Sequence, residues 1–214
     1  MADYRAVNKK KMDYQYPKGA VMALLATDFV TDATRKALKE RLEENEYQPL
    51  FFDPANFECL SVVCDRLIAQ DSNSRIVNIA VHIDERLQRK TGDGWRYDNM
   101  PSDDQMYIKG LKGIDETAQL HFQIKFIQLT NEQQMEILRS VQHGSAKGVV
   151  WQELPPQRFF EELLAETTEI FFSHPLVQDE MGYAGMADAK GWERIGLNER
   201  EPIEPVAIKN EKQI

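Results

Sequence analysis

A chain of 214 residues is long enough for one sizeable hydrophobic core with appendages, because domains usually contain about 100 to 200 residues. The formal net charge of −9 and the pI near 5.0 provide no basic stripe for phosphates, which excludes nucleic acid as a main partner. No apolar run approaches the roughly 18 residues of a membrane-spanning helix, so we expect a soluble chain.

Residues 1–30 are expected to form a leading segment. Four lysines precede the short apolar run 20–26, a pattern that faintly resembles the start of a secretory signal. Pro17 and Gly19 interrupt the pattern, and no pair of arginines precedes it. We therefore expect this segment to pack on the body of a cytoplasmic protein, with a secretory signal as the alternative.

Apolar residues repeat at intervals of three and four through residues 31–172, which predicts a helical body. Good N-caps support several helix starts, among them Thr31, Asp53 followed by Pro54, and Thr130 with Gln133. The predicted helices cover about 31–44, 53–68, 74–90, 102–126, 130–144 and 155–171.

Two glycines, Gly110 and Gly113, lie inside the fourth predicted helix. Each costs about 1 kcal/mol relative to alanine in a helix interior. We therefore expect another backbone to approach the helix closely at these positions, rather than a break in the helix.

The last segment, residues 173–214, carries aromatics and glycines without apolar periodicity. Proline and glycine recur so often that no helix or strand of ordinary length is expected. Tyr183, Trp192, Ile195 and Leu197 are large apolar groups that a disordered polar tail usually lacks. The predicted fold is therefore all-α, a bundle of about six helices with an extended, irregular C-terminal arm. This arm is expected to lie along the chain's own surface or along a partner's.

Cys59 and Cys64 lie five residues apart in a predicted helix. Helical geometry puts their Cα atoms about 7.5 to 8.5 Å apart, on opposing sides. They cannot form a disulfide with each other at that distance. We expect two buried or half-buried thiols, with a bridge to another chain as the alternative.

The sequence offers few residues for catalysis or cofactor binding. It contains no Gly-x-Gly-x-x-Gly, no phosphate-binding loop and no Gly-x-Ser-x-Gly elbow. No histidine lies three residues after a glutamate, as a helical di-iron site would require. His82 and Glu85 are one helical turn apart and offer two metal ligands, although such a pair is more often a surface pair. No residue is assigned a catalytic, cofactor-binding or metal-binding role.

Several short elements, taken in order, resemble the gluconate 2-dehydrogenase subunit 3 family over about Phe51 to Glu201. The most distinctive is the finish Phe171-Phe172-Ser173-x-Pro175 followed by Gly191-Trp192-x-x-Ile195-Gly196. The earlier elements are Tyr107, Gly110, Leu111, Ile114, Asp115, Ala118, Phe122, Phe126, Leu129, Gln133, Gln134, Ile137, Leu138, Gly144, Phe159, Phe160 and Thr167. Where the family often has Gly-Gly-Asn after the proline, this chain has Leu176-Val177-Gln178.

The resemblance implies a non-catalytic small subunit that stabilises and assists folding of an FAD-dependent sugar or glycoside dehydrogenase. FAD is then expected on a large partner subunit of the glucose-methanol-choline type, and no cofactor on this chain. Many relatives carry a twin-arginine export signal that this chain lacks, which fits relatives that resemble cytoplasmic glucoside 3-dehydrogenase small subunits, with periplasmic co-export as the alternative. The runner-up function is a stand-alone helical binding or metal-dependent protein.

Candidate contacts with the partner are the large apolar residues of the arm and of the last helix. Tryptophan is enriched at interface hot spots, so Trp151 is a candidate as well, with core packing as an equally weighted alternative. The full set is Trp151, Phe171, Phe172, Pro175, Tyr183, Trp192 and Ile195.

Overall fold

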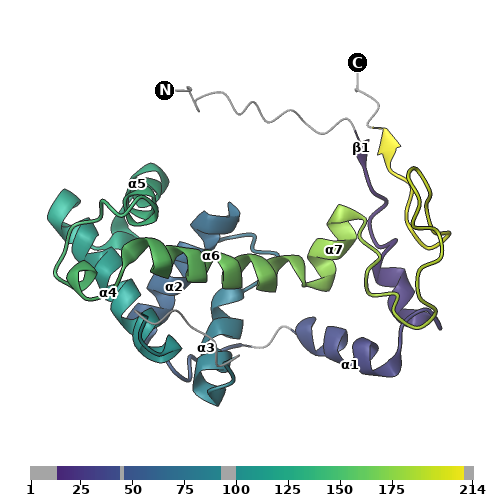
Figure 1. The fold of residues 1–214 in the computed structure, drawn as a ribbon, viewed down its shortest axis with the longest axis horizontal. Helices are drawn as coiled ribbons and strands as arrows, with labels where there is room; N and C mark the ends of the chain where they lie inside the picture. The colour runs from purple at the N-terminus through teal and green to yellow at the C-terminus, as the bar shows by residue number, and fades with distance from the viewer. Residues whose placement is uncertain (1–13, 44–45, 93–99, 210–214) are drawn as a thin grey trace. The chain divides into compact units, whose positions relative to one another are not determined.

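The computed structural model describes residues 14–43, 46–92 and 100–209, and it confirms the all-α class (Figure 1). The α-helices in this part of the chain are α1 (Asp32–Arg41), α2 (Pro54–Ile68), α3 (Ile79–Arg89), α4 (Asp103–Phe122), α5 (Asn131–Gln142), α6 (Pro156–Phe172) and α7 (Pro175–Met181). Three short 3-10 helices accompany them: η2 (Met22–Ala26), η3 (Phe126–Gln128) and η4 (Val150–Gln152). The strands β1 (Tyr14–Gln15) and β2 (Ile208–Lys209) form a small antiparallel pair.

The chain divides into two compact units. Unit 2 contains residues 45–171, and unit 1 combines residues 1–44 with residues 172–214. Helix α1, which the sequence analysis placed in the helical body, therefore lies in unit 1 together with the arm. The two ends of the chain are brought into one unit, and Figure 1 shows β1 beside β2.

In unit 2, α2 and α5 begin where their capping residues predict. The Asp53 carboxylate accepts the Asn56 amide at 2.9 Å, and Thr130 with Gln133 forms a complete capping box. Helix α2 contacts α3, α4 and α5 and so lies at the centre of the unit. The largest fully buried side chains of this core include Leu60, Tyr107, Phe126, Ile137, Phe159 and Leu163.

The glycines of α4 do mark a close approach, but aromatic rings approach them rather than another backbone. A Cβ atom on Gly113 would lie 2.6 Å from the Trp151 ring, and one on Gly110 would overlap the Phe159 ring. The two rings pack against each other with centroids 5.8 Å apart. Glycine is required here because any side chain would displace this aromatic pair.

Two predicted helix boundaries were wrong. The third helix begins at Ile79 rather than near residue 74, because the Gln70 side chain accepts the amides of Ile76 and Val77 at 3.0 and 3.1 Å and holds that stretch as a loop. The fourth ends at Phe122, after which Gln123 is left-handed with φ 61°.

Phe126 therefore belongs to η3 and not to the α4 face, although it is fully buried as expected. The expected helix end at Glu44 lies outside the described residues, as does most of the loop that follows α3.

The arm is mostly irregular, as predicted, but it contains one short helix that the sequence analysis missed. His174 precedes α7 and accepts the Leu176 amide through Nδ1 at 3.3 Å, while Pro175 occupies the first helical position. Gly182 ends the helix in the left-handed conformation with φ 67°. Among the described helices, none is both long enough and apolar enough to cross a membrane.

Candidate interaction surface

Asp179 of α7 joins the arm to the leading segment within unit 1. Its carboxylate accepts the backbone amides of Gly19, Val21 and Met22 at 2.6, 2.8 and 3.0 Å. These amides lie at the start of η2, where they have no partner inside the helix. A single buried side chain therefore satisfies three donors that lie about 160 residues away in sequence.

A second carboxylate, Asp188, binds the start of α1. It accepts the Thr31 amide and hydroxyl, both at 2.8 Å, and the Thr34 hydroxyl at 2.6 Å. These hydrogen bonds lower the pKa of Asp188 from 3.8 to about 2, and the bond from the Thr31 amide has the largest effect. The far end of α1 is also held, because His174 Nε2 contacts the Arg41 carbonyl at 2.9 Å and Arg41 donates to the Ser173 carbonyl at 2.9 Å.

Next to Asp188, two further contacts bind the arm to Phe29. The Ala189 amide donates to the Phe29 carbonyl at 2.9 Å, and the Lys190 ammonium lies 4.4 Å from the centre of the Phe29 ring. Lys190 also pairs with Asp28 at 2.9 Å, which lowers the pKa of that carboxyl.

Beneath these polar contacts lies a small hydrophobic core. The leading segment and α1 contribute Val21, Leu24, Leu25, Val30 and Leu38, and the arm contributes Ala184, Met186 and Ala187. The arm from Pro175 to Lys190 therefore packs on the chain's own leading segment. The sequence analysis had given two alternatives for the arm, the chain's own surface or a partner's, and this part of the arm takes the first.

Two tyrosines in this unit lie on glycines. The Tyr16 ring occupies the position that a side chain on Gly182 would take, and the Tyr183 ring does the same over Gly185. Tyr183 remains 56% exposed despite this contact. The glycines thus let aromatic rings of this chain lie flat on the arm's backbone.

Beyond Lys190, the arm forms a loop, residues 191–201, which we call the apolar loop. Glu201 accepts the amides of Glu193, at 2.6 Å, and Arg194, and these hydrogen bonds lower the pKa of the Glu201 carboxyl. Glu199 accepts the Gly196 amide at 3.1 Å. The carboxylates fix the backbone of the loop without covering its apolar side chains.

Those apolar side chains face solvent in this structure. Trp192 is 38% exposed, Ile195 83% and Leu197 94%. Just beyond the loop, Ile203 is partly buried against the unit 1 core and so anchors the loop's C-terminal side. A loop held in shape by its own carboxylates, with three large apolar groups outside, is typical of a surface that binds another protein.

The other interface candidates are scattered. Trp151 is only 9% exposed, donates from Nε1 to Thr117 at 2.8 Å and packs on Phe159, which places it in the core of unit 2. Pro175 is buried, Phe171 is half-buried and Phe172 is exposed. The structure therefore brings Trp192 and Ile195 together on one loop, with Tyr183 on the same arm, and places Trp151 elsewhere.

Unit 2 contains a polar cluster that sequence reasoning missed. Arg86 of α3 binds Glu166 of α6 through two hydrogen bonds of 2.5 and 2.8 Å, and binds Asp103 of α4 at 2.6 Å. Tyr107 donates to Glu166 at 2.5 Å, and its burial, with the negative charge of Glu166, raises the Tyr107 pKa well above its ordinary value. The cluster ties three helices together with a neutral tyrosine and paired charges.

In the described part of the chain, no group of three or more histidine, cysteine or acidic residues is placed to hold a metal ion. Glu85 pairs with Arg89 at 3.0 Å, an ion pair that the sequence analysis did not predict. Both cysteines are buried free thiols, as predicted, and burial raises the pKa of each to about 12.

Sequence reasoning also missed Asp179 and Asp188. An acidic residue that accepts distant amides leaves no periodic pattern in the sequence, so neither residue differs there from an ordinary surface carboxylate.

Comparison with known proteins places the chain in context. A family model described as gluconate 2-dehydrogenase subunit 3 matches residues 54–196, from the first residue of α2 into the apolar loop. The match covers most of unit 2 and the part of the arm that contains Asp179, Asp188, Trp192 and Ile195. We found no significant match among curated proteins or among solved structures.

Proposed function

Because the chain belongs to the gluconate 2-dehydrogenase subunit 3 family, and is therefore a small subunit of a dehydrogenase complex, we propose that it is a non-catalytic subunit that stabilises its partner and assists its folding. The proposed partner is a large subunit of the glucose-methanol-choline type, which carries FAD and oxidises a sugar or a glycoside. This chain then contributes binding surface rather than reactive groups.

The observation that carries the proposal is the apolar loop. Trp192, Ile195 and Leu197 are exposed on a backbone that Glu199 and Glu201 hold in place. A preformed loop loses little conformational entropy when it binds, so more of its apolar burial contributes to affinity. Large aromatic anchors surrounded by polar groups carry most of the free energy at protein interfaces.

The buried carboxylates support a structural role for the rest of the chain. Asp84 accepts the Tyr47 hydroxyl at 2.7 Å and the amides of Leu50 and Phe52 at 2.7 and 2.9 Å. Asp65 accepts two short hydrogen bonds from Arg75, at 2.8 and 2.7 Å. A general acid or base needs a proton that it can exchange with substrate, whereas these groups are engaged in holding loops and helices.

The alternative, a stand-alone metal-dependent protein, is less well supported. That alternative rested on His82 and Glu85, and Glu85 is engaged with Arg89.

We also propose that the complex is cytoplasmic, and the two free thiols fit a reducing compartment. Cell fractionation of the complex distinguishes it from periplasmic co-export.

Co-expression with a large dehydrogenase subunit of the glucose-methanol-choline type tests the proposal. With an affinity tag on this chain, we expect flavin absorbance and sugar-dependent dye reduction to co-purify, and neither to accompany the tagged chain expressed alone. Expression of the large subunit without this chain should yield less flavin-loaded protein. Stoichiometric flavin on the isolated chain, or a large subunit that never co-purifies with it, would contradict the proposal.

A further inference from the structure

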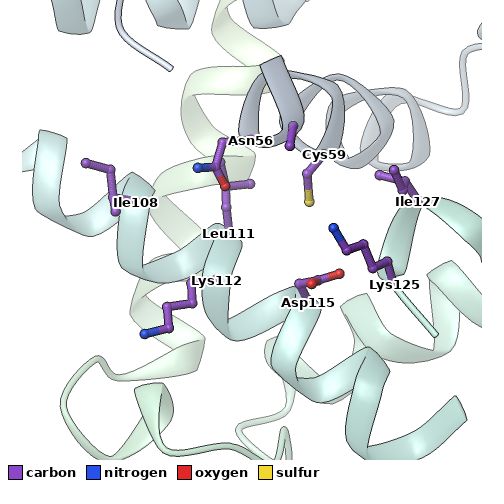
Figure 2. Close-up of a pocket in the computed structure, with 9 residues that line it drawn as sticks. Asn56, Cys59, Ile108, Leu111, Lys112, Asp115, Lys125 and Ile127 are labelled. Atoms are coloured by element: carbon purple, nitrogen blue, oxygen red, sulfur yellow. The ribbon is translucent and has the colours of Figure 1, made fainter. Parts of the chain in front are cut away.

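Unit 2 has a pocket that the proposed function does not use. It lies between the first turn of α2, the middle of α4 and η3, and its volume is about 280 Å³. Ala55, Ile108, Leu111 and Ile127 provide apolar walls. Figure 2 shows the Lys125 ammonium between Cys59 and Asp115, whereas the Lys112 side chain extends away from them.

The size of the pocket limits its occupant. Pockets for cofactors and drug-sized ligands usually measure about 300 to 1,000 Å³, so this one, at about 280 Å³, is small for a flavin. It has room for one large side chain. Ile108 and Lys125 are exposed at its rim, which keeps it open to an incoming protein segment.

The charge around the pocket is opposite to that of the whole chain. Two lysines line it and one carboxylate, Asp115, whose Oδ1 accepts the Phe126 amide at 2.9 Å. The first turn of α2, with Ala55 and Asn56, also borders the pocket, and the carboxylate of Asp53, which caps that turn, lies next to Asn56. Among the residues that line this apolar hollow, lysines thus outnumber carboxylates by two to one, in a chain of net charge −9.

We propose that this pocket receives an apolar side chain from the large dehydrogenase subunit, next to an acidic residue that pairs with Lys125 or Lys112. This inference rests on the proposed function and adds a second contact, on unit 2, to that of the apolar loop. An apolar anchor in a pocket with a charged pair at the rim is the arrangement that gives protein interfaces both affinity and register.

Two substitutions test the pocket, each with a matched control. Ala55→Trp fills the hollow from an exposed position on α2, and Ala165→Trp places the same side chain at an exposed position on α6. Lys125→Glu reverses the charge at the rim, and Lys147→Glu makes the same change on an exposed loop away from it. Circular dichroism confirms that each variant is folded, and if Ala55→Trp is not, Lys125→Glu decides the test.

The measurement is the affinity of the tagged chain for the large subunit, followed by recovery of flavin absorbance. We expect Ala55→Trp to weaken binding by roughly thirtyfold, as for loss of an interface anchor, with a salt-sensitive loss for Lys125→Glu and no change for the controls. Full recovery with both pocket variants overturns this inference but leaves the proposed function intact. Failure of the wild-type chain to bind refutes the proposed function itself.

Hexanoate tests whether the pocket binds a small molecule in place of a partner side chain, because its aliphatic body suits the apolar walls and its carboxylate suits the lysines. If it binds the isolated chain while both pocket variants still assemble normally, the pocket is a ligand site and the inference is wrong.

Discussion

At the scale of single residues, unit 1 depends on carboxylates that bind backbone amides. Asp188 illustrates the consequence, because its pKa falls from 3.8 to about 2 through hydrogen bonds from Thr31 and Thr34. A carboxyl whose pKa is lowered in the folded state contributes stability above its unfolded pKa. That contribution is lost as the pH falls through the folded value.

We therefore predict that Asp188→Asn lowers the melting temperature of the chain at neutral pH and that this difference disappears between about pH 4 and pH 2. Thermal melts of both proteins across that range provide the measurement. Glu180→Gln, an exposed change on α7, serves as the control. A difference that persists unchanged at pH 2 would show that Asp188 does not hold α1 through its charge.

Gly113 shows which structural features the sequence alone can predict and which it cannot. A glycine inside a strongly apolar helical pattern predicted a close approach, and the structure contains one. The ring that approaches Gly113 could not be predicted, because Trp151 lies in η4, 38 positions later, and that distance has no periodic signal. The same limit hid the pairing of Arg86 with Glu166, 80 residues apart.

At the scale of elements, the helix starts that have capping side chains were predictable, whereas the start of α3 and the end of α4 were not. Capping side chains at Thr31, Asp53 and Thr130 act within a few residues and can be read directly from sequence. The end of α4 at Phe122 is set instead by η3 folding back, with Asp115 accepting the Phe126 amide. The seven residues of α7 escaped prediction because they are too few to show periodicity.

Helix α7 joins the two ends of the chain, and Asp179 is its main contact. We predict that Asp179→Ala destabilises unit 1 by roughly 3 kcal/mol, because three donors lose their acceptor and each unsatisfied buried donor costs about 1 to 3 kcal/mol, partly relieved by water. The measurement is hydrogen exchange at Val21 and Met22, which should become faster. Exchange within unit 2 should not change.

Glu180→Ala is the matched control, since Glu180 is the exposed neighbour of Asp179 on the same helix. Equal exchange rates in both variants would contradict the role given to Asp179.

At the scale of the whole molecule, the family match extends across both units, from α2 into the apolar loop. The sequence predicted an all-α chain with an irregular C-terminal arm, since periodicity and its loss are both local properties. It did not predict that the arm forms a small core with the leading segment, because Ala184, Met186 and Ala187 have no regular spacing.

This arrangement also determines which variants are informative. Deletion from Ser173 onward removes Ala184, Met186 and Ala187 and exposes the apolar side chains of the leading segment, so it would damage unit 1 as well as any interface. Substitutions on the apolar loop avoid that problem because their side chains face solvent. The combined variant Trp192→Ala, Ile195→Ala and Leu197→Ala removes the proposed contacts and leaves Ile203 in the core.

The most direct test measures how much large dehydrogenase subunit binds to the tagged combined variant, compared with the wild-type chain. Exposed apolar residues of unit 2 provide the matched control, Leu50→Ala, Leu120→Ala and Val149→Ala. We predict a loss of about 2 kcal/mol or more, roughly thirtyfold in affinity, for the loop variant alone, with helical circular dichroism unchanged. Undiminished binding by a folded loop variant would contradict the account.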